Sequence, residues 1–152
     1  MSLSAFLTRH AQVLQSGAAL VTAFAAVLAL IVVPWQIAAT ERVQQAQSAR
    51  DIYRDFLNLT VQKPEVAGAD LCSSRDANLR TAYEAYVDHL LYTAEQVLDV
   101  SEEWAVPMQA QIDKHRAHIC SWSETDLAVF SDPVLRLLQH TRQQCAAVTV
   151  CP

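Results

Sequence analysis

Two histidines and a nearby cysteine are the side chains whose types and spacing come closest to a metal site. His115 and His118 are three residues apart, so a helix would place both imidazoles on one face, whereas Cys120 would point away from His115. Two ligands on one face can hold zinc if others arrive from elsewhere, and His89 and His140 are candidates. The spacing matches no zinc signature, so we expect interhelical packing and surface histidines, and no cofactor.

Carboxylates that could act in general acid–base catalysis are present at Glu84, Asp88 and Glu95. They share one broad side of a predicted helix. Catalysis requires such groups in a cleft with a shifted pKa, and a helix face exposed to water explains this spacing better. The serines lie mostly at predicted caps and in loops, without a nucleophile-elbow motif. The sequence therefore predicts no enzymatic activity.

Tyrosine and tryptophan side chains could either pack a core or anchor a protein interface. Core packing is the default, because a buried tyrosine needs only a partner for its hydroxyl group. An interface is the alternative, because both residue types are common at the centre of protein contacts. The aromatic side chains that we consider as interface anchors are Trp35, Tyr83, Tyr86, Tyr92 and Trp104.

A long apolar segment near the start of the chain indicates where these side chains are held. Thirty residues between His10 and Glu41 carry no charge, and Ala18–Val33 is apolar apart from Thr22. A helix of about 20 apolar residues crosses the hydrocarbon core of a bilayer. We therefore predict a transmembrane helix over residues 13–39, which makes the lipid bilayer a partner.

A signal peptide would also contain an apolar segment, but two features favour an uncleaved anchor. Only Arg9 precedes the apolar residues as a basic side chain, and Ile37 stands where a cleavage site requires a small residue. Residues 1–12 are amphipathic and could lie in the headgroup layer before the chain enters the membrane.

Small side chains along this span favour contact with another membrane helix. Small residues allow two helices to approach closely within lipid. Alanine is common in membrane spans, so lipid exposure remains the alternative. The expected packing face consists of Ala18, Thr22, Ala25, Ala26 and Ala29.

The orientation of the span follows from the basic residues around it. Arg9 is alone on the N-terminal side, whereas Arg42, Arg50 and Arg54 follow the span closely. Basic residues accumulate on the cytoplasmic side, so we expect a single-pass protein of the cytoplasmic membrane with its C-terminal domain in the cytoplasm. The cysteines leave this question open. Disulfides would suit an exported domain, and reduced buried thiols a cytoplasmic one; the four are Cys72, Cys120, Cys145 and Cys151.

The rest of the chain shows helical periodicity without strand alternation. The sequence therefore predicts an all-α protein, in which the transmembrane helix continues into a small antiparallel helical bundle over residues 40–152. The expected helices cover residues 40–62, 76–100, 102–120 and 133–147.

The charge of this predicted domain excludes one class of partner. The whole chain carries a net charge of −5, and after residue 40 there are 10 basic and 16 acidic residues, a net charge of −6. Nucleic-acid binding requires clustered lysine and arginine, so we expect no nucleic-acid partner.

Three stretches and one tryptophan carry a resemblance to known proteins: Ala49–Leu57, Leu90–Leu98, Trp104 and His115–Cys120. They are similar to small single-span bacterial membrane proteins with a C-terminal helical domain, which form no named family. The resemblance implies an anchor followed by a helical domain. It implies no activity and assigns no functional residue.

These observations favour a membrane-anchored, non-enzymatic accessory or assembly subunit that binds other membrane protein subunits. The alternative is a homo-oligomeric membrane sensor or effector whose helical domain binds a small ligand or a metal. In that case the partner in the membrane would be a second copy of the chain.

Overall fold

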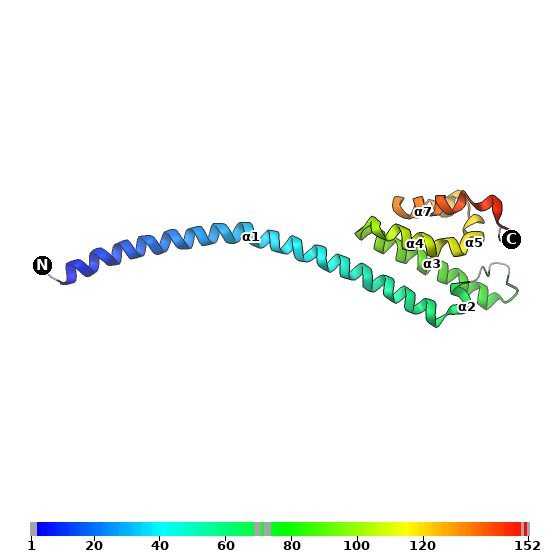
Figure 1. Ribbon diagram of the computed structural model, residues 1–152, viewed down its shortest axis with the longest axis horizontal. Helices are drawn as coiled ribbons and strands as arrows, with labels where there is room; N and C mark the ends of the chain where they lie inside the picture. Colours follow the sequence, from blue (N-terminus) through cyan, green and yellow to red (C-terminus); the bar gives the residue numbers. More distant parts are fainter. Residues whose placement is uncertain (1–2, 69–70, 72–73, 150, 152) are drawn as a thin grey trace. The chain divides into compact units, whose positions relative to one another are not determined.

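The computed structural model describes residues 3–68, 71, 74–149 and 151, with side chains from residue 21 onward (Figure 1). Within these residues every regular element is helical, which confirms the predicted all-α class. The chain divides into two compact units, Met1–Gln44 and Gln45–Pro152. We describe each unit by itself.

The first unit is formed by the N-terminal part of helix α1 (Leu3–Gln62). Over Val21–Thr40 every side chain is exposed, including large apolar ones such as Phe24 and Ile31. Pro34 lies inside the helix, and the Thr40 hydroxyl donates to the Gln36 carbonyl oxygen at 2.9 Å. By length and composition this helix could cross a membrane, and a signal sequence has the same two features.

The second unit contains the last turns of α1 and a series of shorter helices that follow one another closely. The α-helices after α1 are α2 (Pro64–Ala67), α3 (Ala77–Val100), α4 (Ala105–Ile112), α5 (Arg116–Cys120), α6 (Glu124–Leu127) and α7 (Asp132–Arg142). Three 3-10 turns separate or follow them: η1 (Glu102–Trp104), η2 (Asp113–His115) and η3 (Cys145–Ala147).

Helix α3 supplies the centre of the core, because its apolar side chains cover a wide stripe. Tyr83, Leu90, Leu91 and Val97 are fully buried. Helix α7 packs against α3, α4 and α5, and α4 also packs against α3 (Figure 1). The last turns of α1 add Ala49 and Phe56, both fully buried, to the same apolar cluster.

Two of the expected helices end differently from the prediction. The segment predicted as one helix over 102–120 is divided into η1, α4, η2 and α5. Pro107 lies in the first turn of α4, where its missing N–H is not required, and the backbone of His115 leaves the helical region at φ −108° and ψ 26°. The last helix, expected over 133–147, begins one residue earlier at Asp132 and ends at Arg142, and the chain continues into η3.

A disulfide joins Cys120 at the end of α5 to Cys145 in η3, with the two Cα atoms 5.7 Å apart. Cys151 is disulfide-bonded as well, and its N–H donates to the Ala117 carbonyl oxygen at 3.4 Å. Closing a loop of this length stabilises a fold by about 3 kcal/mol, chiefly through the unfolded state. The C-terminal segment is therefore held covalently against α5.

Candidate functional site

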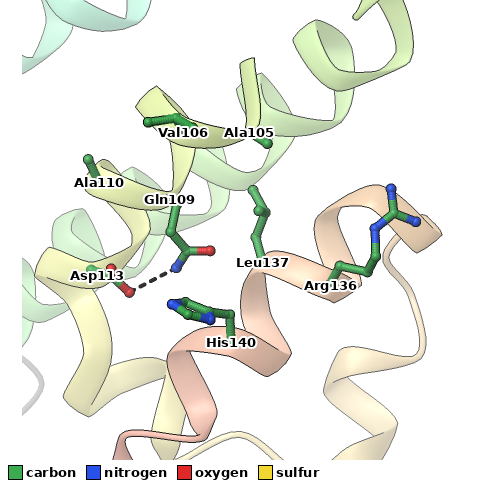
Figure 2. Close-up of a pocket in the computed structure, with 8 residues that line it drawn as sticks. All are labelled: Ala105, Val106, Gln109, Ala110, Asp113, Arg136, Leu137 and His140. Carbon is green, nitrogen blue, oxygen red and sulfur yellow. Dashed lines mark hydrogen bonds between the residues drawn. The ribbon is translucent and has the colours of Figure 1, made fainter. Parts of the chain in front are cut away.

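A pocket of about 520 Å³ lies between α4 and α7 (Figure 2). Figure 2 shows one wall formed by α4 and the facing wall formed by α7. The lining residues are Ala105, Val106, Gln109, Ala110, Asp113, Arg136, Leu137 and His140. Four of these residues are apolar and four carry polar groups, so the pocket combines apolar walls with polar groups, as binding sites commonly do.

A hydrogen-bonded network at one end of the pocket joins α4 to α7. The Asp113 carboxylate accepts from the Gln109 amide at 2.9 Å and from the Thr141 hydroxyl at 2.8 Å. The same amide nitrogen of Gln109 also donates to Thr141 at 2.8 Å. Arg116 completes the network, because its Nη2 lies 3.7 Å from the Asp113 carboxylate.

This network determines what the pocket offers to a ligand. The Gln109 amide nitrogen faces Asp113 and Thr141, so the amide oxygen is the acceptor that is left to face the pocket (Figure 2). His140 adds a ring beside it, and Arg136 is paired with Glu102 at 3.1 Å. Asp113 accepts hydrogen bonds from Gln109 and Thr141 and is ion-paired with Arg116, so its role is to hold the Gln109 amide in place. The arrangement suits an apolar group that carries a hydrogen-bond donor.

The histidines considered as metal ligands do not converge on one point. His115 and His118 both contact the Tyr83 ring, each at a centroid distance of 5.4 Å. His89 lies beside Phe56, and His140 lines the pocket on α7. In the part of the chain that the structure describes, no three His, Cys, Asp or Glu side chains come close enough to hold a metal ion.

His115 is instead a buried partner of Tyr83. Its ring is 1 % exposed, and Nδ1 lies 3.1 Å from the Tyr83 hydroxyl. Burial, together with the nearby positive charges of Lys114 and His118, lowers the pKa of His115 from 6.5 to about 4. At neutral pH the imidazole is therefore uncharged and acts in packing and hydrogen bonding.

Two of the five expected interface anchors belong to the core. Tyr83 is fully buried and Tyr86 is 4 % exposed, so neither presents a ring to a partner. The Tyr86 hydroxyl lies 3.1 Å from the Thr60 hydroxyl, and burial raises the pKa of Tyr86 although this hydrogen bond lowers it. Both residues are buried because helical periodicity places them on the apolar stripe of α3.

The other three aromatic residues differ in exposure. The half-buried Trp104 ring packs against Tyr53 at a centroid distance of 5.1 Å. Tyr92 is 62 % exposed and Trp35 is 77 % exposed, so both rings are accessible.

The small residues proposed as a packing face lie on α1. Thr22, Ala25, Ala26 and Ala29 are exposed along the helix, whereas the side chain of Ala18 lies outside the described residues. Large apolar side chains such as Phe24 and Leu28 surround them. These residues therefore lie on the surface of α1, and their contact with another membrane helix remains a prediction.

The α4–α7 network was not expected from the sequence. Gln109 and Asp113 are four residues apart, and this spacing places them on one face of a helix. Thr141 is distant in the sequence, and only the fold brings it to them. The local spacing of Gln109 and Asp113 was the single signal available.

No protein-family model, curated protein or solved structure matches this chain. The resemblance to small single-span bacterial membrane proteins therefore stays a prediction. The site is interpreted from its own geometry.

Replacing Thr141 with valine keeps the shape of the side chain but removes the hydroxyl group. Gln109 and Asp113 then lose a partner in a partly buried place, so we expect the free energy of unfolding to fall by about 1–3 kcal/mol. Chemical denaturation of the full-length chain in detergent measures this change. Thr81→Val is the matched control, since Thr81 is exposed on α3, and we expect it to alter stability by less than about 0.5 kcal/mol. Equal effects of the two substitutions would contradict the proposed role of the network.

The lowered pKa of His115 predicts a loss of stability in acid. Below pH 6.5 the unfolded chain binds a proton at this residue while the folded chain does not, until the pH reaches about 4. Over this interval we expect His115 to reduce the free energy of unfolding by up to about 3 kcal/mol. Denaturation of wild type and His115→Gln at several pH values tests this. The variant should show the shallower pH profile, and parallel profiles would contradict the assignment.

Proposed function

We propose that this chain is a membrane-anchored, non-enzymatic accessory or assembly subunit that binds other membrane protein subunits. The observation that carries the proposal is the apolar surface of α1, where every side chain over Val21–Thr40 is exposed. Each buried methylene group is worth about 0.8 kcal/mol, so a surface of this kind is stable only when lipid or another protein covers it.

The small residues of α1 support contact with another helix. A second helix can approach the backbone of α1 closely at Ala25, Ala26 and Ala29, and van der Waals packing stabilises such a contact within lipid. The α4–α7 pocket offers a second place for a partner, because its apolar walls and the acceptor of Gln109 would suit a side chain of another protein.

One observation favours the alternative, a homo-oligomeric sensor or effector that binds a small ligand. The α4–α7 pocket has a volume of about 520 Å³, within the range of about 300–1,000 Å³ that small-molecule sites occupy. The composition of the isolated complex distinguishes the two functions.

We further propose that the C-terminal domain lies on the exported side of the membrane. The arginines that follow the span favour the cytoplasm, whereas the Cys120–Cys145 disulfide favours an oxidising compartment. We give more weight to the disulfide, because cytoplasmic reductants keep thiols reduced and an excess of three arginines over one sets orientation only weakly. The domain would then face the periplasm or the cell exterior.

The anchor and the partners can be tested together with a double substitution, Leu28→Arg and Ile31→Arg. A charge at the centre of a span costs about 2.5–3.5 kcal/mol, so this variant should leave carbonate-washed membranes. Wild type should stay in them and should be released by mild detergent together with different membrane polypeptides, as mass measurement of the isolated complex would reveal.

Val61→Arg is the matched control, because Val61 is 80 % exposed on α1 but lies beyond the apolar segment. This variant should behave as wild type. A wild-type complex that contains copies of this chain alone would refute the accessory function and favour the sensor. A wild-type chain that is soluble and lacks its N-terminal segment would show that the apolar helix is a cleaved signal sequence.

Thiol trapping tests the exported placement. Cells are quenched in acid, and the denatured chain is treated with a maleimide–polyethylene glycol reagent before and after reduction. Wild type should gain mass only after reduction, because the cysteines that the structure describes, Cys120, Cys145 and Cys151, are disulfide-bonded. Cys120→Ser should gain mass without reduction, because the substitution leaves Cys145 unpaired. Labelling of wild type without reduction would support the cytoplasmic placement instead.

A further inference from the structure

A second pocket, of about 380 Å³, lies where α3, α5 and α6 meet. We call it the carboxylate–aromatic pocket. It is lined by Glu84, Asp88, His118, Trp122, Thr125, Asp126, Val129 and Phe130. Three carboxylates and three aromatic rings therefore share one small volume, and lysine and arginine are absent from this lining.

The carboxylates of this pocket lack cationic partners. Glu84 and Asp88 are four residues apart on α3, both exposed, and the ion pairs found within the described ranges include neither of them. Like charges at this spacing repel each other. Asp126 accepts from the Ser123 N–H and hydroxyl, at 2.8 and 2.7 Å, and these bonds lower its pKa. A bound cation would relieve the repulsion between the carboxylates that line this pocket.

The aromatic rings are held in a fixed row beside these charges. The Trp122 and Phe130 rings are parallel within 4°, with centroids 5.8 Å apart. The His118 ring meets Trp122 edge-on at 5.5 Å. Trp122 and Phe130 are half-buried and pack against the core, so part of each side chain remains accessible. Aromatic faces attract cations through the ring quadrupole, and tryptophan does so most strongly.

Resting on the proposed function, we propose that the carboxylate–aromatic pocket binds an arginine side chain of a partner protein. A guanidinium group is planar and always charged, so it can stack on an aromatic ring and pair with carboxylates at its edge. The net charge of −6 after residue 40 favours a basic partner surface. Val129, which is 77 % exposed at the rim, offers an apolar contact for the chain around the arginine.

Calorimetric titration of the full-length chain in a non-ionic detergent tests this assignment. The probe is the peptide acetyl-Ala-Arg-Ala-amide, and the matched neutral probe carries citrulline in place of arginine. We expect the arginine peptide alone to bind. Glu84→Gln together with Asp88→Asn should raise its dissociation constant by about fivefold or more, because each exposed carboxylate contributes a modest electrostatic gain.

Asp99→Asn together with Glu103→Gln is the control, since both carboxylates are exposed but lie outside the pocket. This variant should bind the arginine peptide within about twofold of wild type. Equal losses in the two double variants would reduce the effect to general charge attraction and overturn the proposal. Equal binding of the citrulline peptide, or no binding of either peptide, would also overturn it. Tetramethylammonium binding as tightly as the peptide would assign the pocket to a small organic cation instead.

The same variants separate this inference from the proposed function. Loss of co-isolated membrane polypeptides from the Glu84→Gln, Asp88→Asn chain, but not from the control, would support the pocket as the docking point. If both variants retain these polypeptides, the docking inference fails while the proposed function stands. If wild type itself carries no other polypeptide, the proposed function fails, whatever the peptides do.

Discussion

The domain depends on the burial of the wide apolar stripe of α3. Tyr83, Leu90 and Val97 are fully buried along it, and one partner helix could not cover so broad a surface. The last turns of α1 supply Phe56, while α4 and α7 cover other parts of the stripe. Because α4 and α7 both pack against α3, they lie close enough to each other to form a pocket between them. Residues of α5 and α6 line the second pocket together with residues of α3.

The sequence predicted the all-α class and the main helices because helical periodicity and apolar content are local properties. It could not predict where the 102–120 segment breaks, since the residue at the break, His115, is buried against Tyr83, which lies 32 residues away in the sequence. The same limit applies to the sites. The i,i+4 spacing of Gln109 and Asp113 is visible in the sequence, but Thr141 and the Trp122–Phe130 stack are brought in by tertiary packing. Tyr83 and Tyr86 follow the default expectation of core packing, and their burial leaves no exposed ring for the alternative interface role.

The orientation of the chain rests on two opposed physical arguments. In the proposed topology, the arginines beyond the apolar segment bear on how the helix would enter the membrane, whereas the Cys120–Cys145 disulfide bears on the redox chemistry that the folded domain would meet afterwards. The first argument concerns a few charges of modest effect. The second concerns the covalent bond that joins η3 to the end of α5, and for this reason the disulfide weighs more in the proposed topology.

The position of Ala49 and Phe56 has a practical consequence for work on the domain alone. Both side chains are completely buried, yet they belong to α1, the helix that also contains the apolar segment. A fragment that begins after Gln62, where α1 ends, would lack Phe56. The loss would leave a cavity in the core and would expose the ring of Tyr86 on α3, which the Phe56 ring contacts. A fragment that starts near Gln45 keeps these residues and omits the apolar segment, so it is better suited to crystallisation or NMR.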